Sequence, residues 1–434
     1  MPPLQTPSTS GRTPVCAPLS AVLAVTFVNS LGTGIVTNGV FFVARESYGF
    51  GPLRNYGLGL LLGFFYVAGA LGVSPLLLRL ASRHASISTR AVLIGVTAML
   101  GTLCFLPLLA ARLDAGSWAI WLFTACYSAL SGSLWPMIES YLSGGRRDRA
   151  LRSAIGRFNV VWGVAVVAAF WLMAPLVKPW PLGIIAILGV LHVLTAAITW
   201  PLGAEPGRHL ESRAEPHPHV YRSLLRVLRV LLPTSYFIAA AWQPFAPTAV
   251  ERIGIAVAWQ TPLVATWMAS RVIVFIVMER WHGWHGRWRT PLAGAFLLGI
   301  GFAVSVLAPL AGPGLPGAAA MIAGLSILGL GMGIIYSAAL YYAMEVGEAE
   351  VSAGGKHEAL IGLGFTLGPA CGLAGTLGVE TGLLRGVAVE VAVLSSVGIV
   401  LLGVGVVVAR LVVRGARSNP ANLPNAATVQ GDGR

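Results

Sequence analysis

The stretch SGSLWPMIE, residues 131–139, has a counterpart in SAALYYAME, residues 337–345. The two stretches share a serine, a leucine, an aromatic residue and a final glutamate, each pair 206 positions apart. Ile155-Gly156 and Ile361-Gly362 keep the same offset. Because 206 is close to half of the 434 residues, the pattern indicates an internal repeat with two homologous halves.

Composition places the chain in a membrane. Hydrophobic residues make up 56% and charged residues 10%, against roughly 25% charged residues in soluble domains. So few charges cannot cover a water-soluble surface, whereas a lipid bilayer solvates apolar side chains. The net charge of +13 is spread as arginines between apolar runs, so no nucleic-acid partner is expected.

The apolar runs predict the fold class. A spanning helix needs about 20 apolar residues, and polar residues 204–228 form a linker between two sets of runs. We expect an all-α polytopic membrane protein with about twelve transmembrane helices in two pseudo-symmetric six-helix bundles, at 18–203 and 229–413, with tails at 1–17 and 414–434. The predicted runs are 18–44, 55–80, 91–111, 117–142, 153–177, 181–203, 229–250, 254–279, 290–311, 317–344, 358–379 and 387–413.

The basic residues predict the orientation. With the N-terminus inside, 22 of the 29 Lys and Arg residues lie on the inner side and 6 on the outer side. The positive-inside rule then places both termini in the cytoplasm. We expect a multi-pass protein of a bacterial cytoplasmic membrane. The four cysteines show no pairing pattern, so neither disulfides nor a structural zinc are expected.

A six-plus-six repeat with cytoplasmic termini and a basic joint between runs two and three resembles the major facilitator superfamily of secondary transporters, over about residues 18–413. In that joint Arg83 matches the family's usual motif, while Ser82 stands where the family has an acid. The resemblance implies alternating access, a small-molecule substrate and an ion gradient as the source of energy. In the family that ion is usually the proton. A monomer without cofactor is expected. No nucleotide-binding P-loop motif occurs, so ATP is not expected as the direct driver.

Glu139 and Glu345 lie at the cytoplasmic ends of their runs, where an ionised carboxylate needs water or a cation. Basic residues lie at the same membrane level in both halves. These clusters suggest an inner gate whose ion pairs form in the outward-open state; the alternative is interfacial charge without a switching role. The predicted partners are Arg83, Arg90 and Arg157 for Glu139, and Arg280, Arg289 and Lys356 for Glu345.

Arg271 lies about eight positions inside the eighth run. A cation at that depth usually faces a polar cavity or a carboxylate, and Glu345 or Glu358 is the expected partner. Arg271 either binds an anionic or polar group of the substrate, or relays coupling, or forms a structural ion pair. The residue pattern leaves these roles open.

Polar residues on four runs suggest a substrate cavity. The resemblance implies that helices one, four, seven and ten line it, and the alternative is hydrogen bonding between helices. The candidates are Asn29, Thr33 and Thr37 on run one, Tyr127, Ser131 and Trp135 on run four, Tyr236 and Gln243 on run seven, and Tyr336 and Tyr341 on run ten.

Other functions are weaker alternatives. His282 and His285 have metal-ligand spacing but no further ligands nearby in the sequence, so no metal site is expected. A polytopic membrane enzyme acting on lipid would need a catalytic cluster near one interface, and the longest loop lacks one. A receptor-like protein without flux also remains open, as do the substrate and the choice between uptake and efflux.

Overall fold

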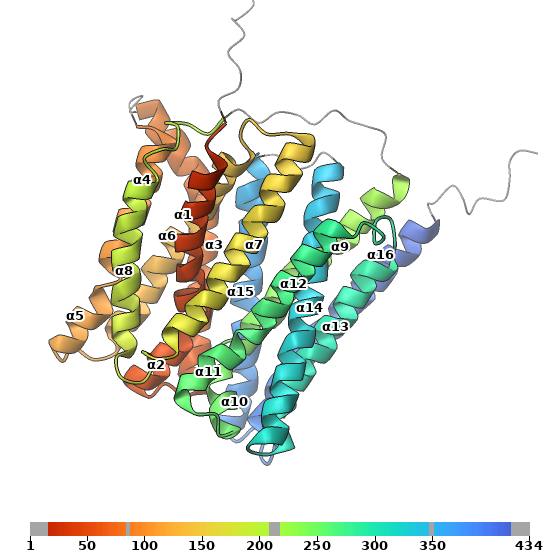
Figure 1. Ribbon diagram of the computed structural model, residues 1–434. Coiled ribbons are helices and arrows are strands. Elements are labelled where there is room, and N and C mark those ends of the chain that lie inside the picture. The colour runs from red at the N-terminus through yellow and green to blue at the C-terminus, as the bar shows by residue number, and fades with distance from the viewer. Residues whose placement is uncertain (1–15, 84–86, 208–217, 347–350, 418–434) are drawn as a thin grey trace, which may run out of the picture.

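The computed structural model describes residues 16–83, 87–207, 218–346 and 351–417, except the side chains of Ala81, Asp148, His219 and residues 344–345, 351–356 and 416–417. These ranges are helical and contain no strand (Figure 1). The elements are α1 Leu19–Gly32, η1 Thr33–Asn38, α2 Val40–Tyr48, α3 Pro52–Arg83, α4 Thr89–Leu103, α5 Leu106–Arg112, α6 Trp118–Ser143, α7 Asp148–Met173, α8 Pro181–Ile198, α9 His219–Trp242, α10 Ala246–Arg252, α11 Val257–Val264, α12 Thr266–Arg280, α13 Arg289–Leu307, η2 Ala308–Ala311, α14 Leu315–Glu345, α15 Val351–Glu380 and α16 Val389–Arg417.

The predicted number of spans is confirmed. Within the described ranges, eleven segments are long and apolar enough to cross a membrane. The remaining predicted run, the fourth at 117–142, is α6, a helix of 26 residues that runs beside the others (Figure 1). Serines and Glu139 lower the hydropathy of α6 below that of the eleven segments.

Predicted runs one, three, seven, eight and nine are each built from more than one helix. The first passes through the π-helix η1 before α2 begins. The seventh breaks between α9 and α10, beside Pro244, which has no backbone N–H to continue the helix. The eighth breaks between α11 and α12 at Ala265. A π-helix changes the number of residues in a turn, so side chains beyond it are rotated relative to those before it.

The two ends of the described chain lie on one face of the bundle (Figure 1). We call this the terminal face, where α1 begins and α16 ends. The other face, which we call the opposite face, carries α2, α5 and α10 (Figure 1). The even number of crossings explains why both ends emerge on the same side.

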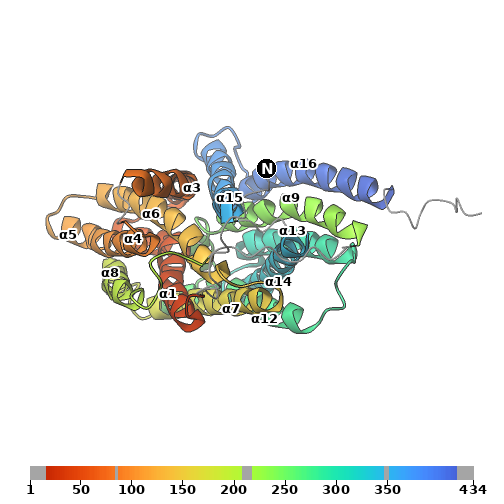
Figure 2. The same cartoon turned by 90° about the horizontal axis from the view of Figure 1, so that it is seen from above.

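Helices α1–α8 and α9–α16 meet along two main contacts, α3 with α15 and α7 with α12 (Figure 2). Glycine makes the first contact possible. A Cβ on Gly63 of α3 would collide with the backbone of Phe365, and a Cβ on Gly362 of α15 would lie 2.7 Å from Val67. Small residues thus let the two backbones approach closely.

Large apolar side chains cover much of the outer surface. Phe64, Leu78, Phe296, Ile399 and Leu402 are examples of exposed apolar side chains on long helices. An aqueous surface would not tolerate such extensive apolar exposure. The chain is therefore a multi-pass integral membrane protein, with lipid covering these side chains.

Candidate functional site

A cavity of about 50 Å³ lies between the two halves. A water molecule needs roughly 10–15 Å³ by the same kind of measure, so the cavity holds a few waters. Seven of its twelve lining residues are aromatic and two are glutamates. The lining consists of Thr33 and Thr37 of η1, Tyr66 of α3, Trp135 and Glu139 of α6, Phe158 and Trp162 of α7, Tyr236 of α9, Tyr336 of α14, and Glu358, Ile361 and Phe365 of α15.

Glu139 and Glu358 face each other in this cavity, one from each half. Their carboxyl groups lie close enough to share a hydrogen bond, and the Tyr66 hydroxyl donates a hydrogen bond to Glu358. An ionised carboxylate only accepts hydrogen bonds. A hydrogen bond between two carboxyl groups therefore requires that one of them carries a proton.

The expected ion pairs of Glu139 are not formed here. Among the described residues, Arg83 and Arg157 are exposed to solvent, and Arg90 donates instead to the carbonyls of Trp200 and Leu202, the latter at 2.9 Å. Glu139 lies inside the bundle, because the contact of α6 with α15 directs it to the cavity and not to the interface. The predicted partners of Glu345 cannot be compared, since its side chain and that of Lys356 lie outside the described residues; Arg289 is exposed.

Arg271 is completely buried, but it does not line the cavity. Its Nη2 donates to the Tyr236 hydroxyl at 3.0 Å. The guanidinium lies over the rings of Tyr336, at 4.7 Å, and Trp162, at 4.9 Å, and also near Tyr236 and Phe275. A guanidinium is attracted to such ring faces.

The expected pairing of Arg271 with Glu358 is corrected by this arrangement. Glu358 is bonded to Tyr66 and Glu139, and aromatic rings surround the guanidinium. Nε and Nη1 of Arg271 have no hydrogen-bond partner among the described residues. The other predicted partner, Glu345, lies outside the described side chains. Aromatic faces thus take the place of a carboxylate, which the sequence pattern alone did not suggest.

Ten polar residues on runs one, four, seven and ten were candidates for the cavity lining. Four of them line neither the central cavity nor the larger cavity described below. Asn29 donates to the Val25 carbonyl at 2.8 Å within its own helix, and Tyr127 bonds His192 at 2.8 Å within the first half. Ser131 is buried in α6. Gln243 donates to Asn38 of the other half. The candidates that do line the central cavity are Thr33, Thr37, Trp135, Tyr236 and Tyr336.

A larger cavity of about 610 Å³ lies near the terminal face, and it includes Tyr341. Its other lining residues come from α7, α12, α14 and the connection 281–288, among them Arg149, Arg152, Glu279 and His282. Its volume is that of a ligand-sized cleft. The two halves are therefore separated near the terminal face.

His285 packs in the wall of this larger cavity. Its ring stacks on Tyr341 with centroids 4.1 Å apart. Burial, with smaller contributions from the nearby His282 and Arg152, lowers the pKa of His285 to about 4. His282 and His285 have ring centroids 5.3 Å apart, and the described residues contain no group of three potential metal ligands.

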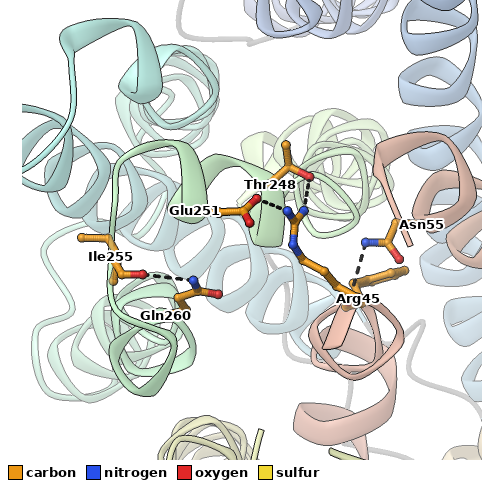
Figure 3. A network of polar contacts seen from close by, with 7 residues as sticks. Arg45, Asn55, Thr248, Glu251, Ile255 and Gln260 are labelled. Atoms are coloured by element: carbon orange, nitrogen blue, oxygen red, sulfur yellow. Dashed lines mark hydrogen bonds and ion pairs between the residues drawn. The ribbon is translucent and has the colours of Figure 1, made fainter. Parts of the chain in front are cut away.

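Toward the opposite face the halves are joined by polar contacts. Arg45 of α2 pairs with Glu251 of α10 and donates to Thr248 at 2.9 Å (Figure 3). The Tyr56 hydroxyl donates to the Ala241 carbonyl at 3.0 Å, across the same interface. Thr261 donates to the Phe170 carbonyl at 2.9 Å. The bundle is thus closed toward the opposite face and open toward the terminal face.

Sequence reasoning missed two groups of residues. Tyr66, Phe158, Trp162, Ile361 and Phe365 lie on helices other than those expected to line the cavity, and no local pattern marks them. Arg45 and Glu251 did carry a signal, because they are 206 positions apart, the same offset as the repeat.

No protein-family profile matches the chain, and no curated protein matches it. Solved structures resemble it. A variant of the nucleoside transporter NupG has a TM-score of 0.63 at 14% identity, over 91% of this chain and 99% of that one. A bacterial homologue of the human lysosomal transporter Spinster, inward-facing and occupied, has 0.61 at 15% identity, over 92% and 96%. At these identities the likeness shows a shared fold.

Proposed function

We propose that this chain, which has the fold of the major facilitator superfamily, is a secondary transporter that moves a small solute by alternating access, coupled to protons. The observation that carries the proposal is the Glu139–Glu358 pair, which joins the two halves inside a small central cavity. A proton held there is bound by both halves at once. Its loss leaves two carboxylates facing each other, which repel and favour separation of the halves.

Alternating access is supported by the unequal closure of the two faces. Polar contacts such as Arg45–Glu251 hold the opposite face together, while about 610 Å³ is open near the terminal face. We assign the terminal face to the cytoplasm, because most of the basic residues lie on that side. The conformation is then inward-facing, like the similar Spinster homologue in its inward-facing form. The inner-gate ion pairs belong to the outward-open state and are not expected in this one.

The moving bodies in this proposal are the halves 18–203 and 229–413, with 204–228 as their linker. The glycine-mediated contact between α3 and α15 serves as one surface on which they rock. Because one chain contains both halves and the cavity between them, it acts as a monomer in the bacterial cytoplasmic membrane. The similar structures are transporters, which favours transport over the lipid-enzyme and receptor alternatives.

Distances between spin labels test the proposal. One doubly labelled protein carries labels at the exposed Arg83 and Arg280 near the terminal face, and another at the exposed Arg112 and Leu383 near the opposite face. In lipid nanodiscs, a change from pH 5 to pH 8 is expected to change the two distances in opposite senses. The double variant Glu139→Gln/Glu358→Gln is expected to remove the response to pH. Distances that never change in opposite senses would exclude alternating access, and an unaltered pH response in the double variant would exclude coupling through this pair.

A further inference from the structure

We infer that the central cavity takes a monovalent organic cation with apolar substituents, such as an alkylated amine or a quaternary ammonium compound, in exchange for one proton of the Glu139–Glu358 pair. This inference rests on the proposed function and adds the substrate class, the stoichiometry and a role for Arg271. It is carried by the chemistry of the cavity lining and by the charge of the groups around it.

The lining suits a cation. Seven aromatic residues and two glutamates line the cavity, whereas lysine, arginine and histidine are absent from the lining among the described residues. The face of an aromatic ring carries negative potential and attracts ammonium groups, most strongly where water is excluded. An anion entering the same cavity would meet the ring faces and at least one carboxylate, which repel it.

Arg271 determines how many positive charges the site can hold. Its guanidinium lies behind the rings of Trp162, Tyr236 and Tyr336, three residues that line the cavity. With both glutamates ionised, the two negative charges and the one guanidinium leave a net charge of −1. One proton or one monovalent cation neutralises the site. Both together would leave an uncompensated positive charge in a buried place, which is unfavourable.

One monovalent cation is therefore exchanged for one proton. As the cation enters from the larger cavity, the proton shared by Glu139 and Glu358 leaves to the water in that cavity. The titratable groups that interact with the pair are Tyr66 of α3, Tyr236 of α9 and Tyr336 of α14, and Arg271 of α12 interacts with the last two of these tyrosines. His357 precedes Glu358 on α15. The tyrosines are neutral at neutral pH, so the charge balance depends on Glu139, Glu358 and Arg271.

An anionic substrate bound directly by Arg271 is the competing class. The guanidinium has no exposed surface and is not part of the cavity lining. The rings that enclose it separate it from the cavity, so an anion would reach it only after these rings had moved. A cation is attracted by the ring faces and carboxylates that already line the cavity, and the cavity has to widen only to admit the larger members of the class.

Proton release from purified protein tests the inference. The probes are tetramethylammonium, tetraethylammonium and tetraphenylphosphonium, added in weak buffer at about pH 7, with calorimetry for binding and a pH-sensitive dye for released protons. Tetraphenylborate, which has the shape of tetraphenylphosphonium and the opposite charge, is the control. We expect at least one cation to bind and to release about one proton per molecule bound. Its affinity should rise about tenfold per pH unit where the pair is protonated.

Variants separate the role of charge from that of packing. Arg271→Gln is expected to bind the cation while keeping its proton, so that proton release falls toward zero. Arg271→Lys keeps the charge and is expected to keep the release, which guards against a mere loss of folding. Lys178→Gln, which removes an exposed cation far from the cavity, serves as the matched control. Glu358→Gln is expected to abolish release.

Three results would overturn the inference: tetraphenylborate binds and no cation does, no probe binds at all, or a cation binds without releasing a proton. An unchanged proton release in Arg271→Gln would remove the role of Arg271. If the cations fail while the spin-label distances still respond to pH through Glu139 and Glu358, then the proposed function stands and the cation class alone is wrong.

Discussion

Glu358 makes two polar contacts across the interface between the halves. It is bonded to Glu139 of α6 and to Tyr66 of α3, both from the other half of the chain. A buried polar group is stable only when its hydrogen bonds are satisfied. Removing one partner therefore affects both the stability of the closed cavity and the position of the proton that Glu139 and Glu358 share.

The first residue-scale prediction concerns the Tyr66 hydroxyl. Tyr66→Phe removes the donor to Glu358 and should lower the free energy of unfolding by about 1–3 kcal/mol, because a buried acceptor is left without its partner. Thermal unfolding in detergent at neutral pH measures the effect. Tyr48→Phe is the control, since the Tyr48 hydroxyl is buried without a hydrogen-bond partner, and its loss should be neutral. Equal stabilities of the two variants would contradict this role of Tyr66.

The second residue-scale prediction concerns His285. Its pKa in the folded protein is about 4, below the usual value of 6.5, mainly because of burial. The neutral ring therefore contributes its full stability above about pH 6.5, and this contribution is lost as the pH falls toward 4. Hydrogen exchange of residues 281–288 should accelerate over that range. His285→Phe keeps the stack on Tyr341 and should remove the acceleration; a variant with the same pH profile as the natural chain would refute the assignment.

At the scale of the element, the π-helix η1 and the glycines of α3 and α15 set the geometry of the cavity. Asn29, Thr33 and Thr37 have the spacing of one helical face, yet only the two threonines line the cavity. The π-helix begins at Thr33 and changes the turn, so Asn29 before it points elsewhere. Close packing of α3 on α15 then brings Tyr66 within reach of Glu358.

The element-scale prediction tests that close packing. Gly63→Ala places a methyl group against the Phe365 backbone, which cannot move aside without separating the helices. We expect a loss of about 1–3 kcal/mol in stability, as for other overpacked interfaces. Fluorescence-detected size exclusion after heating provides the measurement. Gly72→Ala on the same helix has nothing within 4 Å of the added methyl and should behave as the natural chain does. Identical melting curves for Gly63→Ala and Gly72→Ala would show that the contact between α3 and α15 is not tight.

At the scale of the whole molecule, the repeat explains where the halves touch. Arg45 and Glu251 are 206 positions apart and pair with each other. Equivalent residues of two halves related by a two-fold axis meet where that axis passes. The pair therefore lies near the pseudo-two-fold axis of the bundle, at the opposite face, where closing or opening has its largest effect.

The whole-molecule prediction is a charge swap at this pair. Arg45→Glu should favour opening of the opposite face, since it replaces attraction by repulsion. The additional change Glu251→Arg should restore closure. Because the Glu251 side chain is 57% exposed, the attraction is worth only about 0.2–1 kcal/mol. The distance between labels at Arg112 and Leu383 reports the change. A double variant that remains as open as Arg45→Glu would show that the pair does not hold this face closed.

The sequence by itself determined the class of this protein. Apolar runs of the length of a bilayer, an offset of 206 between matching residues and basic joints were enough to predict about twelve helices in two related halves, because these features depend on local composition and spacing. The two threonines of run one and the aromatic residues Trp135, Tyr236 and Tyr336 of the central cavity were found for the same reason.

The tertiary structure alone decided the partners. Glu139 faces Glu358, and Arg271 faces aromatic rings, because α15 packs on α3 and α6, and α12 packs on α7 and α14. Periodicity places a side chain on a face of its own helix, but it does not specify which helix covers that face. Which end of the bundle is closed also depends on contacts between halves distant in the chain, such as Arg45–Glu251. The offset of 206 marks Arg45 and Glu251 as equivalent positions of the two halves, but their pairing arises only when the two surfaces meet.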